Sequence, residues 1–203
     1  MASIYDLKPK FQALLRPLCG ALARAGVTAN QVTIAAAAMS VAGGAAILWR
    51  PGAGWPLLLL VPLLFARMAL NAIDGMLARE HGMQSRLGAI LNELGDVVSD
   101  AALYLPLAAV PGIEPRLLVP LVLLAVVTEM AGVMGQVIGA GRRYDGPLGK
   151  SDRAVAFGLL AFLLGLGVPA GVWIDIFLAV LLALAMLTVA RRCRRALAEA
   201  GPP

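Results

Sequence analysis

Several polar residues interrupt an apolar run near position 70, and their side chains are of types found in catalytic and binding sites. Arg67, Asn71, Asp74 and Ala78 follow one another at helical spacing. At about 100° per residue, these positions fall within about 60° of arc on one helical face. The guanidinium, amide and carboxylate groups of this set therefore gather on one side of an otherwise apolar segment.

A second polar face opens the next segment, where Gly88, Asn92, Asp96 and Asp100 recur every four residues. A short loop joins the two segments, so we expect antiparallel neighbours whose polar faces meet at one level. Polar and ionisable side chains are costly in hydrocarbon, and they usually pair, bind ions or line a wet cavity. The two faces together are therefore a candidate functional site.

The oxygen atoms of this set predict a hard divalent metal. Asp74 and Asp96 supply carboxylates, and Asn71 and Asn92 supply neutral amide oxygens. Such donors suit Mg²⁺, Mn²⁺ or Ca²⁺ better than a soft metal.

Gly75 and Arg79 suit an anionic ligand beside those oxygens. Gly75 has no side chain and would let a phosphate or nucleotide approach the backbone closely. Arg79 offers a planar set of donors to phosphate oxygens. The same polar residues would also suit hydrogen bonds that only hold the two segments together, or a path for protons or ions.

Membrane helices are the elements expected to position these groups. The chain of 203 residues is 60% hydrophobic and 14% charged, whereas soluble domains carry roughly 25% charged residues. The apolar residues form long blocks, each near the ~20 residues that cross a bilayer. We predict an all-α integral membrane protein with six transmembrane helices, at 31–49, 55–78, 87–110, 115–139, 153–169 and 171–190.

An amphipathic interfacial helix is predicted before the first span. Leu7, Phe11 and Leu14 recur at helical spacing among basic residues, a pattern typical of a helix lying on a membrane surface. The expected organisation is an amphipathic juxtamembrane helix at 1–25, a six-span domain at 26–195 and a short C-terminal tail at 196–203.

The net charge of +5 is explained better by membrane topology than by nucleic-acid binding. Lys and Arg concentrate at both ends of the chain and in the loops 79–86 and 140–152, whereas Arg50 and Arg116 flank the opposite ends of the spans. The positive-inside rule then places both termini, both loops and the candidate site in the cytoplasm.

The stretch from Asn71 to Asp96 resembles the pattern of the CDP-alcohol phosphotransferase family, D-x2-D-G-x2-A-R-x8-G-x3-D-x3-D. Asn71 and Asn92 stand where the pattern has its first and third aspartates. The six predicted spans and the N-terminal amphipathic helix also resemble the family's overall form. Six of the eight fixed positions match at the required spacing: Asp74, Gly75, Ala78, Arg79, Gly88 and Asp96.

This resemblance implies a phospholipid-synthesis transferase, usually a homodimer, in the inner or plasma membrane of a bacterium. It would move a phosphatidyl group from CDP-diacylglycerol to a small alcohol, such as the phosphorylated polyols glycerol phosphate or inositol phosphate, and release CMP. Two alternatives stay open: transfer from CDP-choline or CDP-ethanolamine to diacylglycerol, and a CDP-lipid-binding protein in which Asn71 and Asn92 have removed turnover.

The resemblance also implies roles for single residues. Asp96 is the expected general base on the acceptor hydroxyl, and Asp74 is the second catalytic residue. Because two amides lower the charge of the metal site from −4 to −2, we expect one Mg²⁺ or Mn²⁺ ion rather than two. The implied metal ligands are Asn71, Asp74, Asn92 and Asp96, and the implied CDP contacts are Asp74, Gly75, Ala78, Arg79 and Gly88.

Basic residues in and after the second large loop are candidates for binding the acceptor. Arg142, Arg143, Lys150 and Arg153 would grip an anionic acceptor such as a phosphorylated polyol. Positive-inside topology explains basic residues at this place equally well.

Overall fold

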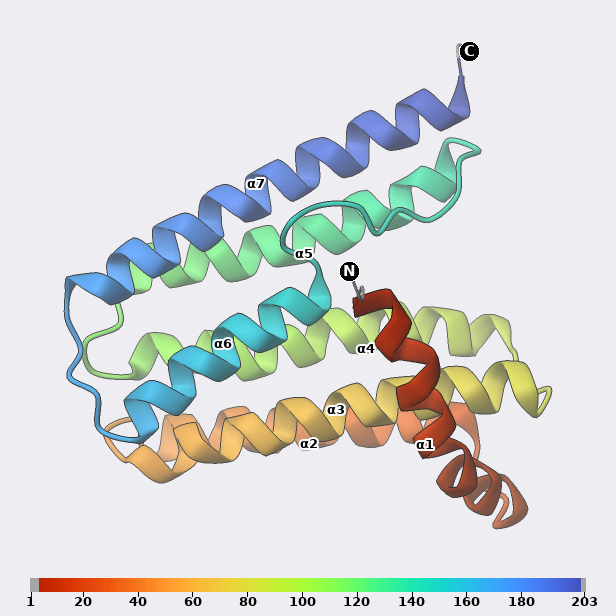
Figure 1. Cartoon of the computed structure of the whole chain (residues 1–203), viewed down its shortest axis with the longest axis horizontal. Helices are drawn as coiled ribbons and strands as arrows, with labels where there is room; N and C mark the ends of the chain where they lie inside the picture. The colour runs from red at the N-terminus through yellow and green to blue at the C-terminus, as the bar shows by residue number, and fades with distance from the viewer. Residues whose placement is uncertain (1–3, 202–203) are drawn as a thin grey trace. The chain divides into compact units, whose positions relative to one another are not determined.

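A computed structural model describes residues 4–201 of the chain. The described residues form seven α-helices and one 3-10 helix, and they contain no strand (Figure 1). The all-α prediction is therefore confirmed, while residues 1–3 and 202–203 of the predicted terminal segments lie outside the described residues. The elements are α1 (Ile4–Arg24), α2 (Ala29–Trp49), α3 (Gly54–Glu80), α4 (Arg86–Tyr104), η1 (Leu105–Ala109), α5 (Pro115–Val137), α6 (Lys150–Gly165) and α7 (Val172–Ala200).

Among the described residues, four helices are long and apolar enough to cross a membrane: α2, α3, α5 and α7. They coincide with four of the six predicted spans. The other two predicted spans overlap α4, which has 19 residues, and α6, which has 16. α6 is shorter than the ~20 residues that cross a bilayer, and α4 carries several charged side chains. The number of six spans and the interfacial position of α1 stay predictions.

Two compact units make up the structure: Met1–Ala42 with Pro62–Ser99, and Gly43–Val61 with Asp100–Pro203. The division falls inside α2, α3 and α4, so each unit takes part of these helices. The polar stretch 67–96 lies wholly in the first unit. The loop after α5 and the whole of α6 and α7 lie in the second.

In the first unit, α1, α2 and α3 share an apolar core that includes Cys19, Val32 and Met76. Gly26 separates α1 from α2 with a φ of 77°, a conformation that glycine adopts without strain. A capping box then starts α2: the Gln31 N–H donates to Thr28 Oγ1 at 3.3 Å, and the Thr28 N–H donates to Gln31 Oε1 at 2.9 Å. These local signals position the start of α2 beside α3.

An ion pair attaches α1 to the last residue of α3, and Figure 1 shows α1 crossing over α3. Arg16 donates from Nε and Nη2 to the two carboxylate oxygens of Glu80, at 3.1 and 2.9 Å. Phe11 and Phe65 make an edge-to-face contact with ring centroids 5.9 Å apart. α1 therefore packs against the part of α3 that carries the polar face.

In the second unit, α5 and α7 lie side by side (Figure 1). The segment 138–149 after α5 folds back along α5, and the Arg143 N–H donates to the Gly132 carbonyl at 3.0 Å. A Cβ on Gly132 would lie 2.6 Å from the Arg143 carbonyl oxygen, and one on Gly135 would lie 2.5 Å from that of Gly141. The two glycines thus let the basic segment lie directly on the helix.

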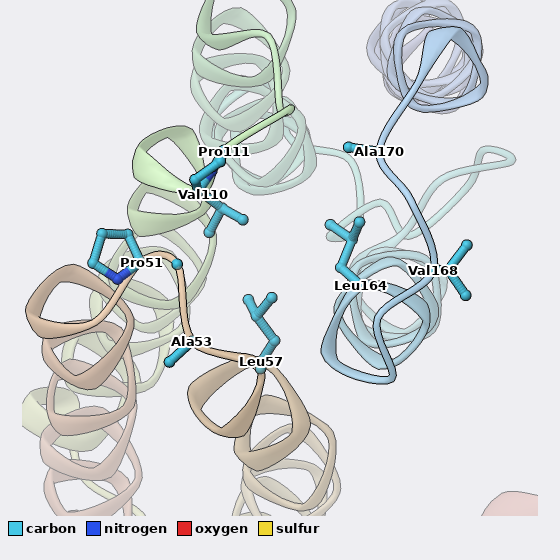
Figure 2. Close-up of a pocket in the computed structure, with 10 residues that line it drawn as sticks. Pro51, Ala53, Leu57, Val110, Pro111, Leu164, Val168 and Ala170 are labelled. Carbon is cyan, nitrogen blue, oxygen red and sulfur yellow. The ribbon is translucent and has the colours of Figure 1, made fainter.

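Connections of the second unit enclose a hollow of about 160 Å³, which Figure 2 shows. It is lined by residues 51–54, Leu57, 110–111 and parts of 164–170. All of these side chains are Pro, Gly, Ala, Leu or Val. The hollow offers no group that can titrate or bind a metal, so it is not a candidate for chemistry.

Candidate functional site

Asp74 is held by a hydroxyl from a different helix. It lies on α3 with 5% of its surface exposed, and its Oδ2 accepts a hydrogen bond of 2.8 Å from the Thr33 hydroxyl on α2. A hydrogen bond from a buried donor restricts the carboxylate to one orientation. Sequence reasoning did not single out Thr33.

Asp96 on α4 is contacted by two side chains of α3. Asn71 Nδ2 donates to Asp96 Oδ1 at 3.1 Å. Arg67 Nη2 lies 3.8 Å from the same oxygen and donates to the Asp96 main-chain carbonyl at 3.0 Å. The Arg67 side chain is 3% exposed and that of Asp96 is 18% exposed. The predicted general base is therefore positioned by a buried cation and an amide, and it retains access from outside.

The predicted metal ligands are divided between these two contacts. Asn71 and Asp96 are brought together, Asp74 is bonded to Thr33, and Asn92 is half-buried one turn before Asp96. Among the side chains that the structure describes, those of residues 9–201, no three from His, Cys, Asp or Glu gather as they would around a metal. Asn71 and Asn92 stand at two of the four predicted positions, so only Asp74 and Asp96 supply carboxylates there. Carboxylate and amide oxygens are donors that hard divalent cations prefer.

Both glycines of the predicted nucleotide contact are places where polar groups approach the backbone. A Cβ on Gly75 would lie 2.8 Å from Nη2 of the exposed Arg79. A Cβ on Gly88 would lie 2.8 Å from Asn30 Oδ1 and 3.0 Å from Ser85 Oγ, which accepts the Gly88 N–H at 2.9 Å. Asn30 is a further polar residue that sequence reasoning missed at this end of the unit.

Ala78, the remaining predicted nucleotide contact, packs half-buried against the apolar core of the first unit. Its small side chain lies on the same helix as Arg79, one residue earlier. All the residues of the family pattern, from Asn71 to Asp96, thus lie in one compact unit.

The arginines predicted to bind the acceptor are engaged by carboxylates of the chain. Arg143 donates to Asp145 Oδ2 at 2.9 Å and also to Glu199. Arg142 Nη2 lies 3.5 Å from Glu129 Oε2. Lys150 is half-buried as the first residue of α6.

Arg153 is buried in the second unit rather than displayed on a loop. It belongs to the first turn of α6 and is 1% exposed. Its Nη2 lies 2.9 Å from Asp100 Oδ2 and 2.8 Å from Glu129 Oε1, and its Nη1 donates to Thr128 Oγ1 at 3.0 Å.

Arg192 on α7 joins the same group of charges. It is 2% exposed, its Nη1 lies 3.4 Å from Glu129 Oε2, and it donates to the main-chain carbonyls of Thr128 and Asp145. Sequence reasoning counted Arg192 only as a cytoplasmic flank. Its helical spacing from the buried Ala185 and Thr188 is the signal that could have identified it. We call Asp100, Glu129, Arg142, Arg153 and Arg192 the arginine cluster.

Asp145 binds the segment 138–149 to α7. Arg195 Nη1 donates to Asp145 Oδ1 at 2.7 Å, opposite the contact with Arg143. Burial raises the pKa of Asp145, but the hydrogen bond and charge of Arg143 and the charge of Arg195 together outweigh it, so the pKa is lowered from its ordinary value. The carboxylate is therefore ionised at neutral pH.

Comparison with known proteins decides which family has this arrangement. The sequence profile of CDP-alcohol phosphatidyltransferases matches residues 26–190. The chain belongs to this family. The resemblance carried by residues 71–96 is thereby confirmed, and the match extends from before α2 into α7.

Relatives with known names agree with that assignment. Inner membrane protein YnbA of Escherichia coli (strain K12) is 44% identical over 197 residues, which cover 96% of each chain. Phosphatidylinositol phosphate synthase of Mycobacterium marinum is 33% identical over 140 residues, 67% of this chain and 58% of that protein. Together with the apolar helices, these relatives indicate an integral inner membrane protein and a transferase of phospholipid biosynthesis.

Solved structures share the fold. Phosphatidylinositol phosphate synthase of Mycobacterium tuberculosis with CDP-DAG bound superimposes with a TM-score of 0.75 at 21% identity, covering 89% of this chain and 92% of that one. The same synthase in complex with manganese and citrate gives a TM-score of 0.74 at 22% identity, with 89% and 87% covered.

Proposed function

We propose that the protein transfers a phosphatidyl group from CDP-diacylglycerol to a small alcohol and releases CMP. The observation that carries the proposal is the placement of Asp96, the last residue of the family pattern. Asn71 donates to its carboxylate, and Arg67 donates to its main-chain carbonyl. Family membership supports the general reaction. The CDP-DAG complex of the mycobacterial synthase supports the choice of donor.

Asp96 would act as the general base. The acceptor oxygen attacks the phosphorus that bears the diacylglycerol, a new P–O bond forms as the P–O bond to CMP breaks, and the hydroxyl proton passes to the Asp96 carboxylate. Arg67 and Asn71 hold that carboxylate in place during the transfer. General bases of this kind typically contribute ~10²–10⁴-fold to rate.

Asp74 and Asp96, with the amide oxygens of Asn71 and Asn92, would hold one Mg²⁺ or Mn²⁺ ion. When bound, such an ion neutralises charge on the diphosphate and the leaving phosphate. The manganese complex of the mycobacterial synthase supports a divalent metal.

The CDP contacts would come from Asp74, Gly75, Ala78, Arg79 and Gly88. Arg79 is exposed and reaches back over Gly75. From there its guanidinium can move onto a phosphate oxygen that enters beside the glycine.

An apolar hollow beside the candidate site supports a lipid donor. Its volume is about 230 Å³, and Thr33, Leu91 and Val98 are among its lining residues. Because Thr33 also bonds to Asp74, an acyl chain lying along this hollow would place its headgroup near the carboxylate.

We further propose that the domain at 26–195 crosses the membrane six times, with α1 on its surface. The distribution of Lys and Arg supports cytoplasmic termini and a cytoplasmic site. We also propose a homodimer, on the resemblance to the family.

A second candidate is a protein that binds CDP-lipid without turnover. The observation that favours it is Asn71, whose NH₂ group donates to Asp96. A carboxylate at position 71 could not make that donation, so the amide changes the environment of the base.

The experiment compares wild type, Asp96→Asn and, as a matched control, Asp175→Asn on α7, all in lipid nanodiscs. CMP release from CDP-diacylglycerol is measured with a panel of alcohols, and CDP-diacylglycerol binding is measured in parallel. We expect CMP release by wild type and the control but not by Asp96→Asn, with binding retained by all three. Binding without CMP release by wild type would establish the second candidate, and absence of binding would overturn both.

The number of metal ions has its own test. We expect one Mn²⁺ per chain in wild type and two in the double variant Asn71→Asp with Asn92→Asp, because the added carboxylates offset repulsion between two cations. Anomalous scattering from Mn²⁺-soaked crystals counts the ions. Two fully occupied sites in wild type would contradict the one-ion proposal.

A further inference from the structure

Three arginines of the second unit converge on one carboxylate. Arg153 Nη2 of α6 lies 2.8 Å from Glu129 Oε1. Arg192 Nη1 of α7 and Arg142 Nη2 of the segment after α5 lie 3.4 and 3.5 Å from Glu129 Oε2. The three guanidinium groups therefore come from three different elements, and together they contact both oxygens of the Glu129 carboxylate.

The convergence is buried. Arg153, Arg192 and Glu129 are 1%, 2% and 7% exposed. Guanidinium groups present planar donors that match the geometry of carboxylate and phosphate alike. Several of them around one buried anion form an oxyanion site, and here the anion is a side chain of α5.

Charge decides whether a phosphate could enter this site. The arginine cluster holds three guanidinium groups and the two carboxylates of Asp100 and Glu129, which sum to +1. A phosphate monoester carries about −1.5 to −2 at neutral pH, so its entry would make the cluster negative and set it against the Glu129 carboxylate. Without Glu129 the cluster would carry +2, which matches a phosphate.

Arg143, the remaining arginine predicted to bind the acceptor, is also paired with carboxylates of the chain. Arg143 is bound by Asp145 and Glu199. Each arginine that the sequence offered for gripping an anionic acceptor thus already contacts a carboxylate of the chain.

We propose that Glu129 occupies the anion site of Arg142, Arg153 and Arg192 in place of a substrate phosphate, and that the acceptor is therefore a small alcohol without a phosphate group. The proposal rests on the proposed function and on the sequence-based prediction that Arg142 and Arg153 bind the acceptor. Glu129 is then a residue that determines specificity.

Matched pairs of acceptors test the selectivity. Glycerol is compared with glycerol 3-phosphate, and inositol with inositol phosphate, by kcat/KM for CMP release. Wild type is expected to favour the unphosphorylated member by at least about tenfold, and Glu129→Gln to lower or reverse that ratio by at least about tenfold. Glu114→Gln, at the residue before the start of α5, is the control and should leave the ratio unchanged. A wild-type preference for the phosphorylated member would overturn the proposal.

Binding of inorganic phosphate tests the same site without turnover. Phosphate at millimolar concentration should leave the thermal unfolding temperature of detergent-solubilised wild type unchanged and raise that of Glu129→Gln. If Glu129→Gln does not fold, wild type alone decides: stabilisation by phosphate that disappears in Arg192→Gln overturns the proposal, and its absence supports it. Wild type that releases no CMP with any alcohol would refute the proposed function, while the phosphate result would still decide whether Glu129 fills the site.

Discussion

Carboxylates lie among apolar helices in both units, but their partners differ. In the first unit, Asp74 accepts from a threonine hydroxyl and Asp96 accepts from an amide with one arginine 3.8 Å away. In the second unit, Glu129 has three arginines within 3.5 Å. In the proposed function the first pair exchanges its hydroxyl and amide donors for a metal ion, whereas Glu129 already has its cations.

The difference shows that a polar group in a membrane helix is not by itself a sign of catalysis. Removing ion-paired groups from water costs several kcal/mol each, so a buried cluster persists only when its charges satisfy one another. A reactive site needs the opposite, namely partners weak enough to be replaced by substrate and metal. The following predictions test that division.

The largest expected effect is on the base of the first unit. Asp96→Asn should lower CMP release by ~10²–10⁴-fold while the thermal unfolding temperature stays close to that of wild type. Steady-state CMP assays and unfolding in detergent measure the two quantities. Loss of folding together with activity would show that Asp96 supports the fold, as Arg153 is expected to do.

Removing a cation from the arginine cluster should affect the fold. Arg153→Met leaves Asp100 and Glu129 without their shortest cationic contact and is expected to cost about 3–5 kcal/mol of unfolding free energy. Chemical unfolding in detergent gives the value. Arg191→Met, an exposed neighbour on α7, serves as the control and should change little. If Arg153→Met has the same unfolding free energy as wild type, the expected difference between the carboxylates of the two units is wrong.

Removing the Thr33 hydroxyl, which orients Asp74, should lower the affinity for metal more than the stability of the fold. Thr33→Val keeps the shape of the side chain but removes the donor, and it is expected to weaken the apparent Mg²⁺ or Mn²⁺ affinity by ~10–100-fold. Metal titration of CMP release measures this. Thr33→Ser retains the hydroxyl and should restore most of the affinity, whereas equal effects of both variants would point to packing alone.

The smallest effect is expected at Asp145, whose ion pairs are partly exposed. Because its pKa is lowered in the folded protein, its contribution to stability is present above the ordinary aspartate pKa of about 3.9 and is lost as pH falls through the folded value. Asp145→Asn should therefore be slightly less stable than wild type at pH 7, by less than about 1 kcal/mol. Unfolding curves of the two proteins should coincide under strongly acidic conditions, and a gap that persists there would contradict the charge-based explanation.

Local sequence predicted those parts of the molecule that depend on neighbours along one helix. The face shared by Arg67, Asn71 and Asp74 follows from helical periodicity, and each helix from α2 to α7 begins within three residues of the start of a predicted span. The family was recognisable from the spacing between Asp74 and Asp96, which the match over residues 26–190 confirms. The ends of α4 and α6 were harder to predict from the sequence. A turn, a 3-10 helix or a capping residue can end a helix inside a stretch whose hydrophobicity stays the same.

Tertiary packing alone decided which charges meet. Arg142, Arg143, Lys150 and Arg153 looked alike in sequence as basic residues of one loop region, yet Arg153 is buried against Asp100 and Glu129, and Arg192 reaches the same carboxylate from α7. Thr33 likewise meets Asp74 only because α2 packs on α3. The amino-acid sequence by itself determined that the chain forms apolar helices, which of their faces are polar, and which family pattern it carries. These features depend only on the types and spacing of residues along the chain. The pairing of each carboxylate depended on contacts between helices distant in sequence, and those contacts give Asp74 a threonine hydroxyl and Glu129 three arginines.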